Sequence, residues 1–71
     1  MLNFKDKSNS KKILIYGFGK TGQSCFNFLK KYNDLTVYDD NHNTIPKKIK
    51  KNYFLNIKKI QNIFFEYIVI S

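Results

Sequence analysis

Three glycines near the start of the chain have the spacing of an anion-binding loop. Gly17, Gly19 and Gly22 form a G-x-G-x-x-G pattern between a short apolar run, 13–16, and a stretch with helical periodicity, 21–31. At such a strand-to-helix junction, the first glycine permits a tight turn and the second leaves the backbone open to a phosphate. The third lets the helix pack close to the sheet. Because the amino end of a helix also favours anions, the pattern predicts a site for the phosphate of a nucleotide.

Polar side chains in and after this loop are candidates for the rest of the site. Lys20 could reach a phosphate and Thr21 adds a hydroxyl donor, although an exposed lysine and a simple helix cap are the structural alternatives. Asp39 lies 22 positions after the first glycine, directly behind a second apolar run. A carboxylate there can accept hydrogen bonds from a ribose hydroxyl or a base N–H. An ordinary turn residue is the alternative for Asp39, and the argument for Asp40 is weaker.

The order of apolar runs and helical stretches predicts alternating strands and helices. Strands are expected at 13–16, 35–38, 53–55 and 67–70, and helices over 21–31, over 47–52 and from 57 to 64, with a polar loop over 41–46. Continuous apolar strands suit a parallel sheet that is covered on both faces. We therefore predict an α/β fold, a Rossmann-like parallel sheet with flanking helices, truncated after its first half.

Hydrophobic periodicity indicates which sides of the two longer helices face the core. The residues expected to face inward are Cys25, Phe28, Leu29 and Tyr32 in the first and Ile57, Ile60, Gln61 and Phe64 in the second. Both sets have the i, i+3, i+4, i+7 spacing of one helical face. The other aromatic side chains are likewise expected in the core rather than in base stacking.

The length and the cysteine count limit what the chain can be. Its 71 residues make at most one small domain, which we divide into a flexible leader, 1–12, and a partial domain, 13–71. The closing apolar run indicates an inner strand, so we interpret the chain as a fragment. The single Cys25 cannot form an internal disulfide, and His42 has no partner at metal-ligand spacing, so we expect no metal and a cytoplasmic location. We find no secretory signal and no apolar stretch of membrane-spanning length.

The charge of +8 comes from 13 basic residues, all lysine, against five acidic ones. A basic excess can indicate a nucleic-acid partner. However, arginine supplies the bidentate contacts that read guanine and clamp phosphate, and the chain has none. Alanine is also absent, which is typical of biased codon usage. We therefore expect most lysines to be solvated and expect no nucleic-acid partner.

The residues around the glycine loop resemble a known family. The stretch 13–24, then Leu29, then 35–40 resembles the N-terminal domain of UDP-N-acetylmuramoyl-L-alanine–D-glutamate ligases, the Mur ligases that add D-glutamate in peptidoglycan synthesis. The ending 65–71 resembles a strand that runs into Ser-Pro-Gly in that family. The resemblance covers 11–71 and is thinnest between 43 and 61.

This resemblance implies a substrate and roles for individual residues. The domain would bind the uridine diphosphate end of a UDP-sugar peptide. Lys20 and Thr21 fall where the family's loop contacts the nucleotide, and 39–41 falls where the family holds the uracil. The family often has arginine near the position of Asn41, whose amide cannot offer the same stacking or charge. Ser71 would begin a loop that faces the sugar.

The family's reaction lies outside this chain. It joins an acid and an amine through an acyl phosphate, with ATP and magnesium held by a central domain that carries a G-x-x-G-K-[ST] loop, and it uses a C-terminal domain for glutamate. The chain contains neither that loop nor a carboxylate cluster. The resemblance therefore implies no catalytic residue and no cofactor here, and a monomer for the full-length family. Two alternatives fit the same loop and Asp39: the NAD-binding half of an oxidoreductase, or a regulatory nucleotide-sensing domain. A basic nucleic-acid module is a third.

Overall fold

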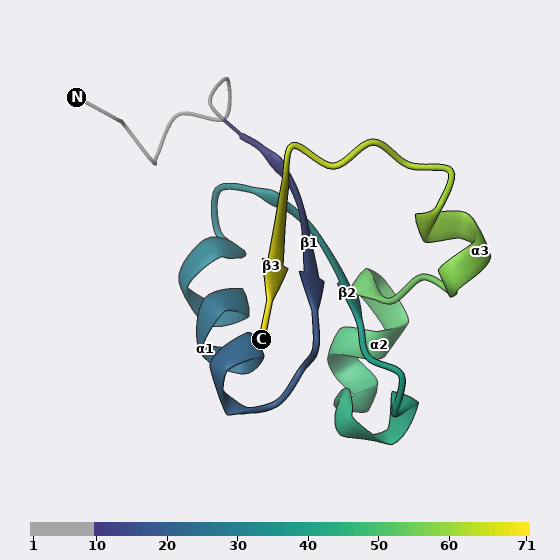
Figure 1. Ribbon diagram of the computed structural model, residues 1–71. Helices are drawn as coiled ribbons and strands as arrows, with labels where there is room; N and C mark the ends of the chain where they lie inside the picture. The colour runs from purple at the N-terminus through teal and green to yellow at the C-terminus, as the bar shows by residue number, and fades with distance from the viewer. Residues whose placement is uncertain (1–9) are drawn as a thin grey trace.

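A parallel sheet of three strands forms the centre of the computed structural model, which describes residues 10–71 (Figure 1). The strands are β1 (Lys12–Tyr16), β2 (Asp34–Tyr38) and β3 (Tyr67–Ile70). The helices are α1 (Lys20–Leu29), α2 (Lys47–Tyr53) and α3 (Ile57–Ile60), with a 3-10 helix, η2, over His42–Thr44. The predicted strands 13–16, 35–38 and 67–70 and the predicted helix 47–52 are confirmed to within one residue at each end.

The strand order creates a change of direction next to β1. The sheet has the order β2-β1-β3, and β1 pairs in parallel with both neighbours, through Tyr16 opposite Tyr38 and Ile70 at its carboxyl end. The chain thus passes from β1 to β2 on one side and later returns to place β3 on the other side. In doubly wound sheets, ligands bind outside the carboxyl ends of the strands at such a switch point.

Side chains of β1 point alternately to the two faces of the sheet, and helices lie on both. On one face, Ile13 and Ile15 belong to a core that Phe26 of α1 and Ile49 of α2 complete. On the other face, Leu14 packs with Tyr38 and with Ile60 of α3. With helices on both faces of a parallel sheet, the chain has the Rossmann-like α/β fold that the sequence predicts.

The predicted inward face of α1 is confirmed for Cys25 and Leu29, which pack against the core, and wrong for Phe28. Phe28 is 71% exposed, while Phe26, which the predicted face did not include, is 2% exposed. The inward side is set by Gly22 and Phe26, with Leu29 packed partly against the core. Periodicity counted large apolar residues only, and it missed that Gly22 must lie against the glycine loop. The helix also ends at Leu29, so Tyr32 lies beyond it.

The predicted third strand, 53–55, is not formed. Tyr53 ends α2, and only Phe54 makes an isolated parallel bridge, to Val37 of β2. The backbone N–H of Phe54 donates to the carbonyl of Lys50 at 3.3 Å and so completes the end of α2. Because α2 continues through Tyr53 and α3 begins at Ile57, only a short segment between the helices can pair with β2.

The second half of the chain is more exposed than its apolar pattern predicts. The helix expected from 57 to 64 is a single turn in which Ile60 is buried, while Phe64 is 81% exposed. Strand β3 was expected to be an inner strand, yet Ile68 and Ile70 are largely exposed. In the described residues β3 is an outer strand that pairs with β1 on one side.

The first strand begins one residue earlier than predicted, within the segment 1–12 assigned to the leader. Residues 1–9 of the predicted leader lie outside the described residues, and Lys12, predicted to end the leader, already belongs to β1. Its ammonium group lies 3.3 Å from the carboxylate of Asp34, its partner in the strand register. None of the helices in the part of the chain that the structure describes has the length and apolar character needed to cross a bilayer.

Candidate functional site

The predicted site residues gather at the carboxyl edge of the sheet. Gly17 follows β1, Asp39 follows β2, and Ser71 follows β3. Because parallel strands end at the same edge, three segments that are far apart in the sequence meet there. Figure 1 shows the end of β3 beside the first turn of α1, next to the loop that leaves β1.

The glycine loop is tied to both neighbouring strands by short hydrogen bonds. The N–H of Gly17 donates to the carbonyl of Tyr38 at 2.7 Å, and the N–H of Phe18 donates to Oδ2 of Asp39 at 2.7 Å. From the other side, the hydroxyl of Ser71 donates to the carbonyl of Gly17 at 2.6 Å. Gly17 has a φ of +100°, a backbone conformation that L side chains rarely adopt. The tight turn predicted for this glycine is therefore present.

The other two glycines differ in what surrounds them. A Cβ atom on Gly22 would overlap the carbonyl oxygen of Gly17, so the close approach of α1 to the loop requires glycine at this position. A Cβ atom on Gly19 would meet nothing within 4 Å. The structure thus needs no glycine at position 19 for its own packing. The open space leaves room for the phosphate that the sequence pattern predicts.

The first turn of α1 has free donors. Gly19 is the N-cap residue and no side chain caps the helix; the first intrahelical bond there runs from the N–H of Gln23 to the carbonyl of Gly19, at 2.9 Å. The N–H groups before Gln23 have no helical acceptor because a helix begins without preceding carbonyls. Lys20 and Thr21 are exposed in this turn. Thr21 lies inside the helix, so its alternative role as the cap does not hold.

Asp39 is an acceptor of two backbone N–H groups. Its Oδ2 accepts from Phe18 and its Oδ1 accepts from Asn41 at 2.9 Å. These two hydrogen bonds hold the pKa of the Asp39 carboxyl below its ordinary value, and the bond from Phe18 has the larger effect. The group is therefore an anion at neutral pH and fixes the loop. A carboxylate has about four lone-pair positions, so Asp39 keeps capacity for a ligand donor.

Asp40 and Asn41 also have partners within the chain. Oδ1 of Asp40 accepts from the hydroxyl of Tyr16 at 3.3 Å. The negative charge of Asp40, together with burial and this hydrogen bond, raises the pKa of Tyr16. The side chain of Asn41 accepts from the N–H of Asn43 at 3.1 Å and caps η2. Sequence reasoning missed Tyr16, because only the parallel register brings its ring beside the end of β2.

An aromatic cluster borders the site. Tyr38, directly before Asp39, stacks on Phe54 with ring centroids 5.8 Å apart, and the ring of His42 lies 4.9 Å from that of Phe54. The ammonium group of Lys50 lies 5.6 Å from the centroid of the Phe54 ring. His42 is exposed but also packs on these rings. No local sequence signal predicts this contact.

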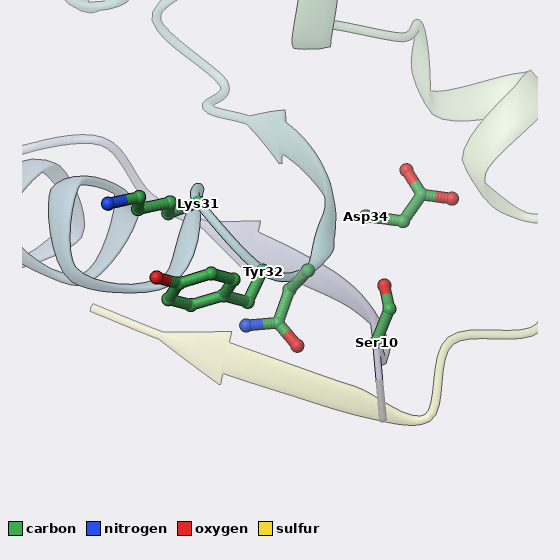
Figure 2. Close-up of a pocket in the computed structure, with 5 residues that line it drawn as sticks. Ser10, Lys31, Tyr32 and Asp34 are labelled. Carbon is green, nitrogen blue, oxygen red and sulfur yellow. The ribbon is translucent and has the colours of Figure 1, made fainter. Parts of the chain in front are cut away.

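A separate depression lies at the opposite edge of the sheet (Figure 2). It has a volume of about 330 Å³ and is lined by Ser10, Lys31, Tyr32, Asn33 and Asp34. Figure 2 shows Lys31 and Tyr32 on one side and Ser10 and Asp34 on the other. Asp34 is the first residue of β2, whereas the glycine loop lies beside Tyr38, the last residue of that strand. The depression therefore contains none of the predicted site residues.

Within residues 10–71, the fold and the site define a Rossmann-like α/β domain with a glycine loop at the switch point of its sheet. No group of three or more His, Cys, Asp or Glu side chains in this range could hold a metal ion. Comparisons with protein-family models, curated proteins and solved structures give no match to this chain.

Proposed function

We propose that this chain binds the uridine diphosphate part of a UDP-sugar peptide substrate, as the N-terminal domain of a D-glutamate-adding Mur ligase does. The observation that carries the proposal is the meeting of Gly17, Asp39 and Ser71 at the carboxyl edge of the sheet, beside the uncapped turn of α1. This edge is where doubly wound folds hold nucleotides.

The diphosphate lies against the first turn of α1 in this proposal. The open space at Gly19 lets a phosphate oxygen approach the backbone, and the N–H groups of the first turn donate to it. Lys20 supplies a positive charge and Thr21 a hydroxyl donor; both side chains are exposed and start from that turn. The absence of any acidic residue in the first turn of α1 supports an anionic ligand.

The nucleoside and sugar ends are assigned from the family resemblance. Asp39 and Asp40, with Asn41, form the segment proposed to face the uracil, and Asp39 keeps lone pairs for a base N–H. Asn41 contributes less in this proposal, since its amide oxygen already caps η2. Ser71 lies beside Gly17 and so borders the phosphate position on the side proposed for the sugar.

The proposal covers binding of the substrate and no chemical step. ATP and magnesium belong to the central domain of the family, and this chain contains no G-x-x-G-K-[ST] sequence that could hold them. We therefore expect no ligase activity from these 71 residues by themselves.

Calorimetric titration of the full chain with four ligands tests the proposal. The ligands are UMP, UDP-N-acetylmuramoyl-L-alanine, NAD and a short oligonucleotide. We expect binding of the two uridine ligands and weaker or no binding of NAD. Binding of NAD without uridine would instead support the oxidoreductase alternative. Salt-sensitive binding of the oligonucleotide alone would support the nucleic-acid module.

Two variants locate the binding at the loop. Gly19→Val places a branched side chain in the phosphate position, and we expect the affinity for UMP to fall at least about tenfold, equivalent to about 1.4 kcal/mol. The chain should still fold because a Cβ atom at position 19 meets open space. Ser24→Val, at an exposed position of α1, is the matched control. Equal affinity in Gly19→Val and Ser24→Val would contradict the loop assignment.

A further inference from the structure

We propose that Asp39 and Ser71 are positioning residues that together fix the orientation of the Gly17–Phe18 peptide group. In that orientation both polar groups of the peptide have partners within the protein, and the ligand phosphate is left to the N–H groups of the first turn of α1. This inference rests on the proposed nucleotide-binding function and adds a role that the glycine pattern does not predict.

The two side chains hold opposite ends of one peptide group. The hydroxyl of Ser71 donates to the carbonyl oxygen of Gly17 at 2.6 Å, and the carboxylate of Asp39 accepts from the N–H of Phe18 at 2.7 Å. In a trans peptide these two groups point in opposite directions within one plane. Rotation of the plane in either direction therefore breaks both bonds.

This peptide group needs such support because glycine precedes it. Turning this peptide over changes ψ of Gly17 and φ of Phe18, and glycine at a φ of +100°, which has no Cβ atom, restricts its ψ less than another residue would. If the peptide turned over, the carbonyl oxygen of Gly17 would exchange places with the N–H of Phe18. The hydrogen bonds to Ser71 and Asp39 would then be lost, and so would the packing of Gly22 against that oxygen.

The supports are themselves well anchored. Asp39 directly follows β2, and its second oxygen is fixed by the N–H of Asn41 at 2.9 Å. Ser71 directly follows β3, and its N–H donates to the carbonyl of Tyr16 at 3.0 Å. Since both residues are held by the ends of paired strands, the loop is preorganised without any contact from a ligand.

The charge of Asp39 is also suited to this task. An ionised carboxylate accepts an N–H about twice as strongly as a neutral group does, and the two N–H donors keep its pKa low. The support is therefore fully present at neutral pH and is lost only when acid protonates Asp39.

The first test follows the Phe18 amide by ¹H–¹⁵N NMR in the unchanged full chain. We expect its proton resonance to lie downfield and to move upfield as pH falls through the pKa of Asp39, with a midpoint below the ordinary value of about 3.9. If the chemical shift of the Phe18 amide proton does not change as Asp39 is protonated, the inference is refuted. The measurement needs no ligand and no variant.

The second test uses three variants and a control. Asp39→Asn and Ser71→Ala each remove one support, and we expect each to shift the Phe18 amide and to weaken UMP binding about tenfold. Ser71→Thr keeps the hydroxyl donor and should restore both properties. Asp34→Asn makes the same charge change at the far edge of the sheet and should leave the Phe18 amide unchanged.

The outcomes separate this inference from the proposed function. If the unchanged chain does not bind UMP but the Phe18 amide responds as expected, the nucleotide proposal fails and the peptide support stands. If UMP binds with unchanged affinity to Asp39→Asn and Ser71→Ala, the positioning role is refuted and the nucleotide proposal stands. Loss of binding in Ser71→Thr equal to that in Ser71→Ala would also refute it.

Discussion

Substitution of Gly22 by alanine should destabilise this protein, although the same change normally stabilises a helix. Alanine is favoured over glycine inside a helix by about 0.5–1 kcal/mol. At position 22, however, the added Cβ atom would overlap the carbonyl oxygen of Gly17 and lie 3.0 Å from the hydroxyl oxygen of Ser71. Both atoms belong to the hydrogen bond that joins β3 to the loop.

The magnitude follows from these contacts. Moving packed groups to admit one extra methyl typically costs about 1–3 kcal/mol. Weakening the bond between Ser71 and Gly17 costs about 0.5–1.5 kcal/mol more. After the gain in helix propensity is subtracted, we expect a net loss of about 2 kcal/mol in the free energy of unfolding. For a domain of this size, that lowers Tm by about 8–16 °C.

The assay is urea denaturation followed by far-ultraviolet circular dichroism, with Gly19→Ala as the matched control. Gly19 has a φ of −76° and open space at its Cβ position, so its substitution should change the unfolding free energy by less than about 1 kcal/mol. A Gly22→Ala chain that is as stable as the Gly19→Ala chain would refute the argument that α1 is held against the loop by glycine.

Three further predictions concern the core and the titrating groups. Phe26→Ala should cost about 3–5 kcal/mol in unfolding free energy by urea denaturation, because that ring is buried, while Phe28→Ala on the exposed side should cost far less; similar losses would contradict the observed rotation of α1. Since the pKa of Asp39 is lowered in the folded chain, its contribution to stability is complete above the unfolded value of about 3.9 and is lost as pH falls through the folded value. Asp39→Asn should flatten the acidic part of a profile of Tm against pH, below about pH 4. An unaltered profile would contradict the stabilising role of the Asp39 carboxylate. The hydroxyl of Tyr16 should ionise above its ordinary pKa of 10.0 in a spectrophotometric titration, and Asp40→Asn should lower the midpoint; no change would show that the charge of Asp40 is not the cause.

The fold could be predicted because its signals are local. The apolar runs that became β1 and β2 and the glycine pattern between them lie within 27 consecutive residues, 12–38. Each is a property of neighbouring residues, so their order specifies the class of fold. The positions of Gly17 and Asp39 at strand ends were predicted for the same reason.

The rotation of α1 could not be predicted from hydrophobicity. The apolar residues of this helix, Cys25, Phe26, Phe28 and Leu29, allow two overlapping faces with the same spacing. What selects between them is Gly22, which has no side chain to count and acts through the close approach that it allows. The exposure of Phe28 follows from that contact and not from its own residue type.

The sequence by itself determined the three strands of the sheet, the helices α1 and α2, the Rossmann-like order of strands and helices, and the glycine loop. All of these depend on local periodicity and on the conformations open to glycine. Only the tertiary structure decided that Ser71 contacts Gly17, 54 positions away, and that Asp39 binds the N–H of Phe18. Within residues 10–71, it also decided that β3 pairs with β1 and that Ile68 and Ile70 are exposed. These features depend on which strands pair and in which register, and pairing between distant segments is a property of the whole packed chain, not of any window of its sequence.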